Sequence, residues 1–340
     1  VIGSITPVTN PIATTINNTI AMIAGGNSVV FNAHPSAKEC TTRTIVGIGQ
    51  AILEAGGPAN LVTGIAAPTI ESAQQLMKHP GTQLTMVTGG EAVVQVAMQS
   101  GKRAICAGPG NPPIVVDETA DLDQAARDIV KGASFDNNII CTDEKNLIVV
   151  ESVADRLLAE LKGLGCRILT SEELARLEKV IFAEPVKKGQ ATGLNKKLIG
   201  QNPSVILKEI GITVSDDVRL AVAEVPKEHT LVWTEQMMPV LPLVRVPHAD
   251  AGIDFAIAVE GGRRHTAVMY SKHLDHLSRM AKEINVSIFV KNGPNLAGLG
   301  YGGEGFTSFS IAGYTGEGMT RPRTFTRERR CVLVDAFRIV

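Results

Sequence analysis

Cys141 is the side chain of this sequence best placed to act as a nucleophile. It lies in the stretch SFDNNIICTDEKNLIVV (residues 134–150), ahead of a charged turn at residues 142–145 and the apolar run LIVV. Such a run predicts a buried strand bounded by polar turn residues, so the thiol is expected in a loop entering the core, with Asn137 and Asn138 adding polarity. A thiolate is an intrinsically strong nucleophile and needs only a partly exposed polar niche. The same stretch also fits a buried, inert cysteine.

Short apolar runs alternate with helical patterns over the first third of the chain. The runs lie at residues 1–5, 28–31, 60–64, 84–88 and 103–106, and the helical patterns at residues 14–24, 36–55, 70–78 and 91–99. This alternation predicts βαβ units, a parallel sheet and the dinucleotide-binding architecture.

Ligands of such sheets bind beyond the carboxyl ends of the strands. The relevant loops are residues 6–11, 32–35, 64–68 and 88–90. The last, Thr88-Gly89-Gly90, precedes a helix whose N-terminus could face a phosphate. No G-x-G-x-x-G follows the first run, and a tight strand-to-helix turn explains the three residues equally well.

The cluster GPGNPP at residues 108–113 is dense in chain breakers and predicts a domain boundary. Beyond it, helical and strand patterns alternate again up to residue 290, which predicts a second α/β domain. The glycine-rich residues 291–305 are either a mobile linker or a functional loop, and we favour function. Residues 331–340 predict a terminal strand whose free edge would pair with a neighbouring subunit.

Composition excludes several classes of protein. The chain has 340 residues, a net charge of −1, 44% hydrophobic residues and only 4% aromatic ones, which fits a folded α/β protein and gives no basic surface for nucleic acid or membranes. Its five cysteines form no C-x-x-C pair, which fits a reducing compartment and no zinc site. No apolar run is long enough for a membrane span. Because the chain opens directly on an apolar strand pattern without methionine, we interpret it as a fragment.

Motifs along the whole chain are similar to those of one enzyme family. They are ITPVTNP, GGNSVVFNAHPSAK, VTGG, GPGNPP, FDNNIICTDEK, EQMMPVLP, HTAVMYS, KNGPN with GGEG, and the closing RTFTRERRCVLVDAFRIV. In this order they resemble the aldehyde dehydrogenase superfamily, and within it the CoA-acylating propionaldehyde and acetaldehyde dehydrogenases of bacterial microcompartments.

The resemblance implies the aldehyde dehydrogenase fold, an α/β architecture. A Rossmann-like parallel-sheet domain for NAD(P) and CoA would occupy residues 1–108, an α/β catalytic domain residues 109–318, and a C-terminal oligomerisation segment with its strand residues 319–340. The resemblance also implies that the start of the first domain, roughly a third of a full-length chain, is missing.

The resemblance places the family nucleophile at Cys141. Its thiolate would attack an aldehyde to give a thiohemiacetal and, after hydride transfer to NAD⁺, a thioester. Candidate donors to the oxyanion are the Cys141 backbone amide and the side chain of Thr9 or Asn10, because ungapped matching on Pro11 leaves both open. His265 is expected to orient substrate or thioester, although a structural histidine fits equally well.

Other site residues are also implied by the resemblance. Those expected to bind cofactor are Pro7, Asn32, His34, Pro35, Ser36, Thr88, Gly89, Gly90, Gly108, Glu235 and Pro239. Glu235 matches the family glutamate that hydrogen-bonds the nicotinamide ribose. In hydrolytic relatives, a charged pair at the position of residues 32–36 holds the adenosine ribose, and this chain lacks that pair. The pocket is therefore expected to bind NAD and coenzyme A in turn. Use of NADP instead of NAD stays an alternative. Side chains expected to wall a short aliphatic acyl pocket are Ile139, Ile140, Met237 and Met238.

The fate of the thioester separates two branches of the family. Hydrolytic members carry a glutamate in an E-L-G-G motif that activates water, whereas this chain reads ICAGPG at residues 105–110. Without that base, water attack is slow and the thiol of CoA can take the acyl group. We therefore expect a CoA-acylating dehydrogenase of propionaldehyde or acetaldehyde. A hydrolytic dehydrogenase giving the free acid, or a nucleotide-binding or shell-associated scaffold without activity, are the alternatives.

The biological setting follows from the same resemblance. It implies a homodimer or homotetramer in the cytoplasm, inside a bacterial microcompartment for propanediol or ethanolamine utilisation. Contacts with shell proteins would be made through the missing N-terminus.

Overall fold

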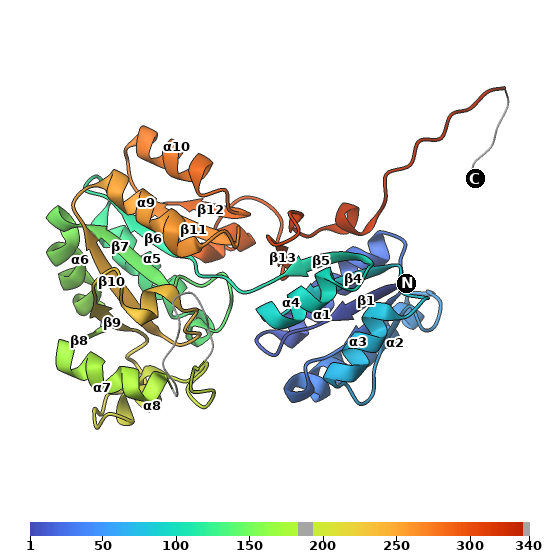
Figure 1. Ribbon diagram of the computed structural model, residues 1–340, viewed down its shortest axis with the longest axis horizontal. Coiled ribbons are helices and arrows are strands. Elements are labelled where there is room, and N and C mark those ends of the chain that lie inside the picture. The colour runs from blue at the N-terminus through green and yellow to red at the C-terminus, as the bar shows by residue number, and fades with distance from the viewer. Residues whose placement is uncertain (183–192, 336–340) are drawn as a thin grey trace.

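The computed structural model of this chain describes residues 1–182 and 193–335 and consists of two lobes, each built on its own sheet (Figure 1). The expected alternation of strands and helices is confirmed in both. Among the described helices, none is both long enough and apolar enough to cross a bilayer.

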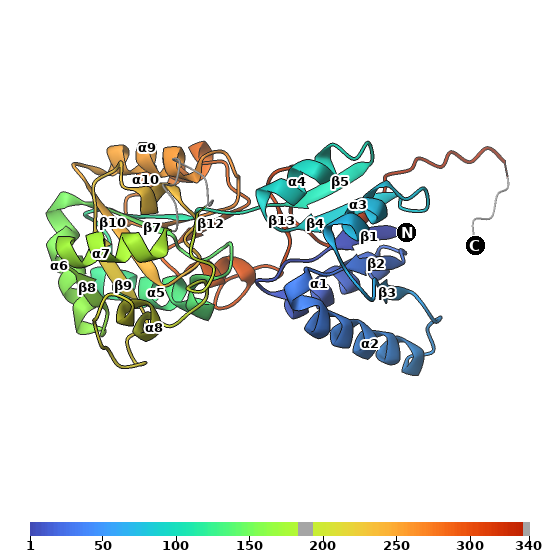
Figure 2. The same ribbon diagram turned by 60° about the horizontal axis from the view of Figure 1, so that its bottom comes forward.

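The first domain is a five-stranded parallel sheet in the order β3-β2-β1-β4-β5. Its elements are β1 (Ile2–Ile5), α1 (Pro11–Ala24), β2 (Val29–Asn32), η1 (Pro35–Ala37), α2 (Lys38–Glu54), β3 (Val62–Gly64), α3 (Ile70–Lys78), β4 (Leu84–Thr88), α4 (Glu91–Met98) and β5 (Arg103–Ala107). Figure 2 shows α1 and α2 on one face of this sheet and α3 and α4 on the other, with a separate hydrophobic cluster on each face. Burial of both faces is what makes the strands continuous apolar runs.

The second domain has a seven-stranded parallel sheet in the order β12-β11-β6-β7-β10-β9-β8. Its strands are β6 (Pro113–Val116), β7 (Asn146–Val150), β8 (Arg167–Leu169), β9 (Ala221–Glu224), β10 (Val240–Val246), β11 (Thr266–Tyr270) and β12 (Ile288–Lys291). Its helices are α5 (Leu122–Ala133), η2 (Phe135–Asn138), α6 (Glu151–Gly163), α7 (Ser171–Ile181), α8 (Pro203–Lys208), η3 (Thr230–Trp233), α9 (Ala249–Glu260), α10 (Leu274–Glu283) and η4 (Asn295–Leu299).

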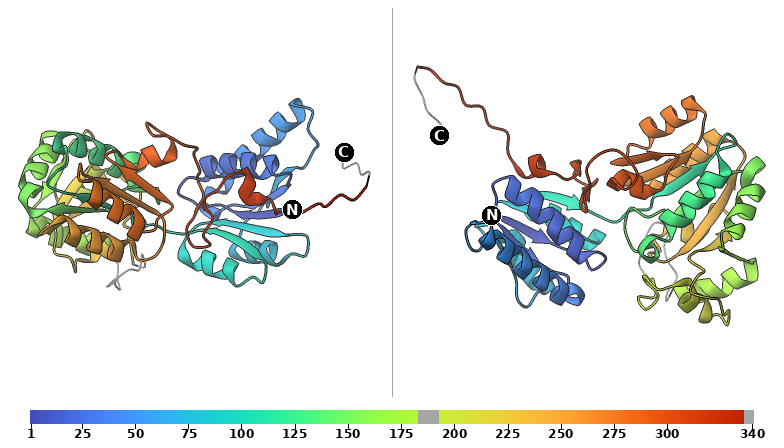
Figure 3. Two further views of the ribbon diagram at one scale, coloured as in Figure 1. Left: turned by 90° about the horizontal axis from the view of Figure 1, so that it is seen from above. Right: turned by 180° about the vertical axis from the view of Figure 1, so that it is seen from behind.

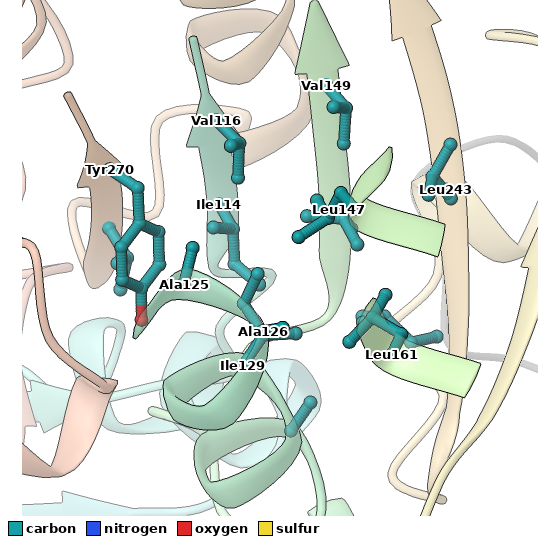
Figure 4. Packing of buried hydrophobic residues seen from close by; sticks show 14 of the residues in the cluster. Ile114, Val116, Ala125, Ala126, Ile129, Leu147, Val149, Leu161, Leu243 and Tyr270 are labelled. Atoms are coloured by element: carbon teal, nitrogen blue, oxygen red, sulfur yellow. The ribbon is translucent and has the colours of Figure 1, made fainter. Parts of the chain in front are cut away.

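Helix α5 shows how the sequence builds this core. Asp121 caps its N-terminus by accepting a hydrogen bond from the backbone N–H of Gln124, at 3.1 Å. Its apolar face, including Ala125 and Ile129, packs on β6 and β7 (Figure 4). Strand β7 is buried along its whole length, so the residues just before it are drawn into the interior as well.

The chain crosses between the domains twice. Residues 108–112 lead from β5 to β6, at the predicted boundary. The return lies near β13 (Ile311–Ala312), because Ile311 belongs to the core of the second domain and Ala312 to that of the first. The expected start of the C-terminal oligomerisation segment at residue 319 is a separate boundary and stays a prediction. Two short elements follow, β14 (Gly318–Met319) and η5 (Pro322–Phe325), and η5 packs on α1.

The expected terminal strand differs from the structure where it is described. Residues 331–335 adopt no strand, and the remainder, residues 336–340, lies outside the described residues. Figure 3 shows the described tail leaving the first domain as an extended segment. The side chains of Val332 and Val334 are 74% and 81% exposed, so nothing within the described chain covers them. A strand of this kind needs a second sheet edge to form.

Candidate active site

The loop that carries Cys141 begins with three consecutive residues in the left-handed backbone conformation. Asp136, Asn137 and Asn138 have φ angles of 45°, 52° and 61°, and Asp and Asn tolerate this region better than most residues. The Lys145 ammonium holds the turn by donating to both the carbonyl and the side-chain oxygen of Asn138, each at 2.6 Å. The loop then places Cys141 in a half-buried position before β7.

The expected polar turn at residues 142–145 is a buried segment, which corrects that interpretation. Thr142, Asp143, Glu144 and Lys145 are each at most 1% exposed. They are buried because β7, which they precede, is inserted between two other strands. Their hydrogen-bond partners include Asn138, Ile140 and Asn295. The thiol is therefore backed by a buried polar cluster.

Gly110 is the point at which the site residues meet. A Cβ on Gly110 would lie 2.5 Å from the Cys141 carbonyl oxygen and 3.0 Å from Cγ of His265. The backbone N–H of Gly110 donates to Oε1 of Glu235, at 3.3 Å. The structure thus brings together Cys141, Glu235 and His265 from three separate segments of the second domain, around one residue of the interdomain connection.

Burial and charge set the protonation states at this point. Burial, followed by the nearby Glu235 carboxylate, raises the pKa of the Cys141 thiol to about 12, against the opposing charge of Lys145. Burial also raises the pKa of Glu235. The resting thiol is therefore protonated at neutral pH and must lose its proton as it attacks.

His265 is neutral at physiological pH. Burial, with smaller effects from Lys145 and Arg263, lowers its pKa to about 3. Its Nδ1 shares a hydrogen bond with Oγ1 of Thr266 at 3.0 Å, and Nε2 is buried without a hydrogen-bond partner among the described residues. The imidazole next to Gly110 is therefore a neutral hydrogen-bonding group, and its lowered pKa makes it a poor proton acceptor.

Two of the four expected pocket residues meet at Gly200. A Cβ on Gly200 would lie 3.1 Å from Cδ1 of Ile139, and the Gly200 N–H donates to the carbonyl of Met237 at 3.0 Å. Ile140 is buried beside Cys141, whereas Met238 is fully buried within the hydrophobic cluster on β9 and β10.

The expected cofactor residues of the first domain lie at the carboxyl ends of its strands. At the end of β2, the Asn32 side-chain oxygen accepts from Oγ of Ser72 at 2.6 Å, and Thr88 at the end of β4 shares a 2.6 Å hydrogen bond with Ser310. Gly90 caps α4 with open space around its Cβ position, so the first amides of this helix can meet an anionic group. The amides at the start of α4 are donors suited to a phosphate, and the roles of Asn32, Thr88 and Glu235 toward a nicotinamide dinucleotide stay predictions.

The remaining expected residues lie in both domains, and Pro239 directly precedes β10 of the second. His34, Pro35 and Ser36 are exposed, and the Ser36 N–H donates to Nδ1 of His34 at 3.2 Å. Three others are buried: Pro7, Gly108 and Pro239. Gly108 lies against the ring of Tyr314, which leaves no room for a Cβ at this position.

Thr9 and Asn10 lie in the first domain where β1 leads into α1. Both are half-buried, and Asn10 accepts a hydrogen bond from Oγ1 of Thr14 at 2.9 Å. Their role as oxyanion donors stays a prediction.

Sequence reasoning missed Gly110, Asp143, Lys145 and Asn295. The signal for Gly110 was its place in the proline-rich stretch at residues 108–113. Besides Gly108, it is the only residue of that stretch without a Cβ. For the buried charges, the signal was three consecutive charged residues that lie only one residue before the apolar run LIVV, too close to a buried strand for all of them to reach solvent.

Comparisons with known proteins agree with this geometry. The profile described as the aldehyde dehydrogenase family matches residues 1–169. The chain is 53% identical, over its whole length and 73% of the relative, to an acetaldehyde dehydrogenase (acetylating) of Salmonella typhimurium. This chain belongs to the aldehyde dehydrogenase family. It is also 48% identical to a propanal dehydrogenase (CoA-propanoylating) of the same organism, over 100% of this chain and 72% of that relative.

Solved structures place this aldehyde dehydrogenase in the CoA-acylating branch, as the sequence motifs predicted. The Rhodopseudomonas palustris propionaldehyde dehydrogenase, solved with bound CoA and an acylated cysteine, superposes with a TM-score of 0.93 at 46% identity, covering 98% of this chain and 74% of that one. A propionaldehyde dehydrogenase from the fucose utilisation microcompartment of Clostridium phytofermentans gives a TM-score of 0.94 at 43% identity, covering 100% and 77%.

Proposed function

We propose that this aldehyde dehydrogenase oxidises a short-chain aldehyde, propionaldehyde or acetaldehyde, and transfers the acyl group to CoA. The observation that carries the proposal is the half-buried Cys141, whose carbonyl oxygen lies beside Gly110 together with the neutral His265 ring, while the Gly110 N–H donates to Glu235. Relatives that carry these two activities are 53% and 48% identical to the chain.

The Cys141 sulfur forms a bond to the carbonyl carbon of the aldehyde, and the carbonyl oxygen becomes an oxyanion. The thiol proton passes to solvent as the sulfur attacks, because His265, with its pKa lowered to about 3, is too weak a base to hold it. His265 is proposed to orient the substrate or thioester by hydrogen bonding. The oxyanion requires preorganised donors, for which the Cys141 amide and Thr9 or Asn10 are proposed.

A nicotinamide dinucleotide, when bound, takes the hydride from the carbon of this adduct. Glu235 and the loop 88–90 are proposed to orient it, with residues 32–36 beside the adenosine. As the hydride leaves, the carbonyl re-forms and Cys141 holds a thioester. NAD is the proposed cofactor; an engineered glycolyl-CoA reductase of 46% identity has been solved with bound NADP⁺.

Hydrolysis of the thioester is slow because the surrounding carboxylates already accept hydrogen bonds from the protein. Cys106 and Gly108 occupy the segment where hydrolytic relatives carry their base, and both are buried. Glu235 accepts from Gly110, and Asp143 accepts from Ile140 at 3.0 Å. The CoA thiolate therefore attacks the acyl carbon, and the bond to the Cys141 sulfur breaks.

The test supplies the enzyme with propionaldehyde or acetaldehyde and NAD⁺, with and without CoA. Sustained NADH formation that requires CoA, with acyl-CoA identified by mass spectrometry, supports the proposal. Equal turnover without CoA, with free acid as product, establishes the hydrolytic alternative. No NADH under either condition favours the scaffold alternative.

We further propose assembly into a homodimer or homotetramer inside a bacterial microcompartment. The exposed apolar side chains of Val332, Leu333 and Val334 support a subunit contact. The structural relative from a fucose utilisation microcompartment supports the setting. Light scattering of the chain with and without residues 327–340 tests the assembly. A monomeric mass in both cases would contradict the proposed oligomer.

A further inference from the structure

Two buried side chains hold the backbone on both sides of Cys141. On the N-terminal side, the N–H of Ile140 donates to Oδ2 of Asp143, at 3.0 Å. On the C-terminal side, the carbonyl of Thr142 accepts from Nδ2 of Asn295, at 2.6 Å. The same Nδ2 also donates to Oδ1 of Asp143 at 3.2 Å, so the two clamping side chains are joined to each other.

The clamp is anchored to elements distant in sequence. Asn295 begins η4, and its own N–H donates to Oε1 of Glu144 at 2.9 Å. Asp143, Glu144 and Asn295 are all fully buried. In such dry surroundings each hydrogen bond is stronger than in water, and an orphaned partner is costly. The peptide groups next to Cys141 are thereby fixed without any contact to its sulfur.

We propose that Asp143 and Asn295 are positioning residues that set the direction of the Cys141 sulfur for the attack and the hydride step. This inference rests on the proposed aldehyde dehydrogenase function and deepens it. The reaction requires the sulfur, the acyl carbon and the nicotinamide in one alignment, and a misplacement of about 1 Å can cost about a hundredfold in rate. Simple access of a reagent to the thiol has no such requirement.

The charges around Asp143 make the clamp sensitive to pH. Burial raises the pKa of Asp143 to about 7, Lys145 opposes this, and Asp136 adds to it. Glu144, which accepts the hydrogen bond from the Asn295 N–H, is also buried, and burial raises its pKa to about 8. Protonation of Asp143 weakens its acceptance of the Ile140 N–H, so the positioning is strongest above pH 7 and weakens as the pH falls below it.

The test compares three clamp variants with one control. Asp143→Ala removes both hydrogen bonds, Asp143→Asn keeps an oxygen that can accept from Ile140, and Asn295→Ser shortens the second arm of the clamp. The control is Asp117→Ala. Asp117 is equally buried and accepts from the N–H of Thr119 at 2.9 Å, but it follows β6 at the opposite end of the sheet from Cys141.

Two rates are measured for each folded variant: single-turnover NADH formation, and alkylation of Cys141 by iodoacetamide, followed by peptide mass spectrometry. We expect single turnover to fall about tenfold to a hundredfold in Asp143→Ala, to fall less in Asp143→Asn and Asn295→Ser, and to stay near the wild-type rate in Asp117→Ala. Alkylation is expected to stay at or above the wild-type rate in every variant, since it requires access and the thiolate form, and loss of the Asp143 charge, which raises the Cys141 pKa, favours the thiolate.

Parallel losses of alkylation and turnover, an equal loss of turnover in the Asp117 control, or wild-type turnover in the clamp variants each overturn the proposal. If Asp143→Ala does not fold, Asp143→Asn and Asn295→Ser decide between these results. Absence of NADH with the wild-type enzyme would instead refute the proposed function itself, so the two failures are distinct.

Discussion

Replacing Gly110 by alanine perturbs the point where nucleophile, histidine and carboxylate meet. The added Cβ would lie 2.5 Å from the Cys141 carbonyl oxygen and 3.0 Å from the His265 ring. Ordinary contact begins near 3.4 Å, so the backbone at Cys141 must move by about 0.9 Å. Backbone cannot rotate away as a flexible side chain can. A displacement of this size in a catalytic alignment costs about a hundredfold in rate, equivalent to about 2.7 kcal/mol.

The assay for Gly110→Ala is CoA-dependent NADH formation, together with thermal unfolding. We expect kcat to fall about a hundredfold, with destabilisation of about 1–3 kcal/mol from overpacking. Gly163→Ala is the matched control in the same domain, because a Cβ there meets nothing within 4 Å. A kcat of Gly110→Ala within about threefold of wild type would refute the geometry on which this reasoning depends.

Three further predictions concern residues around the thiol. Next to burial, the Glu235 charge is the largest cause that raises the pKa of Cys141, and Glu235→Gln removes it. Alkylation by iodoacetamide at a fixed alkaline pH should therefore speed up several-fold. An unchanged rate would show that this charge does not act on the thiol. His265, with its pKa lowered to about 3, stabilises the fold fully above its ordinary pKa of 6.5 and loses this stabilisation as the pH falls. Between pH 7 and pH 5 its contribution should drop by about 2 kcal/mol, so urea unfolding of His265→Gln should lack that decrement, and equal pH dependence in both proteins would contradict it. Ile139→Ala should enlarge the pocket near Gly200 and shift the kcat/KM ratio about tenfold toward a longer aldehyde; an unchanged ratio would remove Ile139 from the pocket wall.

The sequence predicted the elements that bury a repeated apolar pattern. Strands such as β4 and β7 appeared as mainly apolar runs and are buried along their whole length, because both faces of a parallel sheet are covered. The loop position of Cys141 followed from the strand after it. Roles of the cofactor and pocket residues came from family resemblance, and they stay predictions.

The sequence could not predict contacts that depend on tertiary placement. Asp143, Glu144 and Lys145 had the composition of a surface turn, yet the insertion of β7 between β6 and β10 buries them. Strand order in the sheet, which decides this, is not encoded in local periodicity. The closeness of Gly110 to Cys141 likewise depends on where the interdomain connection passes.

The most direct test of the account is the fate of the acyl group on Cys141. The enzyme is incubated with aldehyde and NAD⁺ but without CoA, and its peptides are then weighed by mass spectrometry. We predict an acyl group on the peptide that contains Cys141, stable in buffer and released as acyl-CoA within one turnover when CoA is added. Rapid loss of that group to water as the free acid, or no acylation of Cys141 at all, would contradict the account.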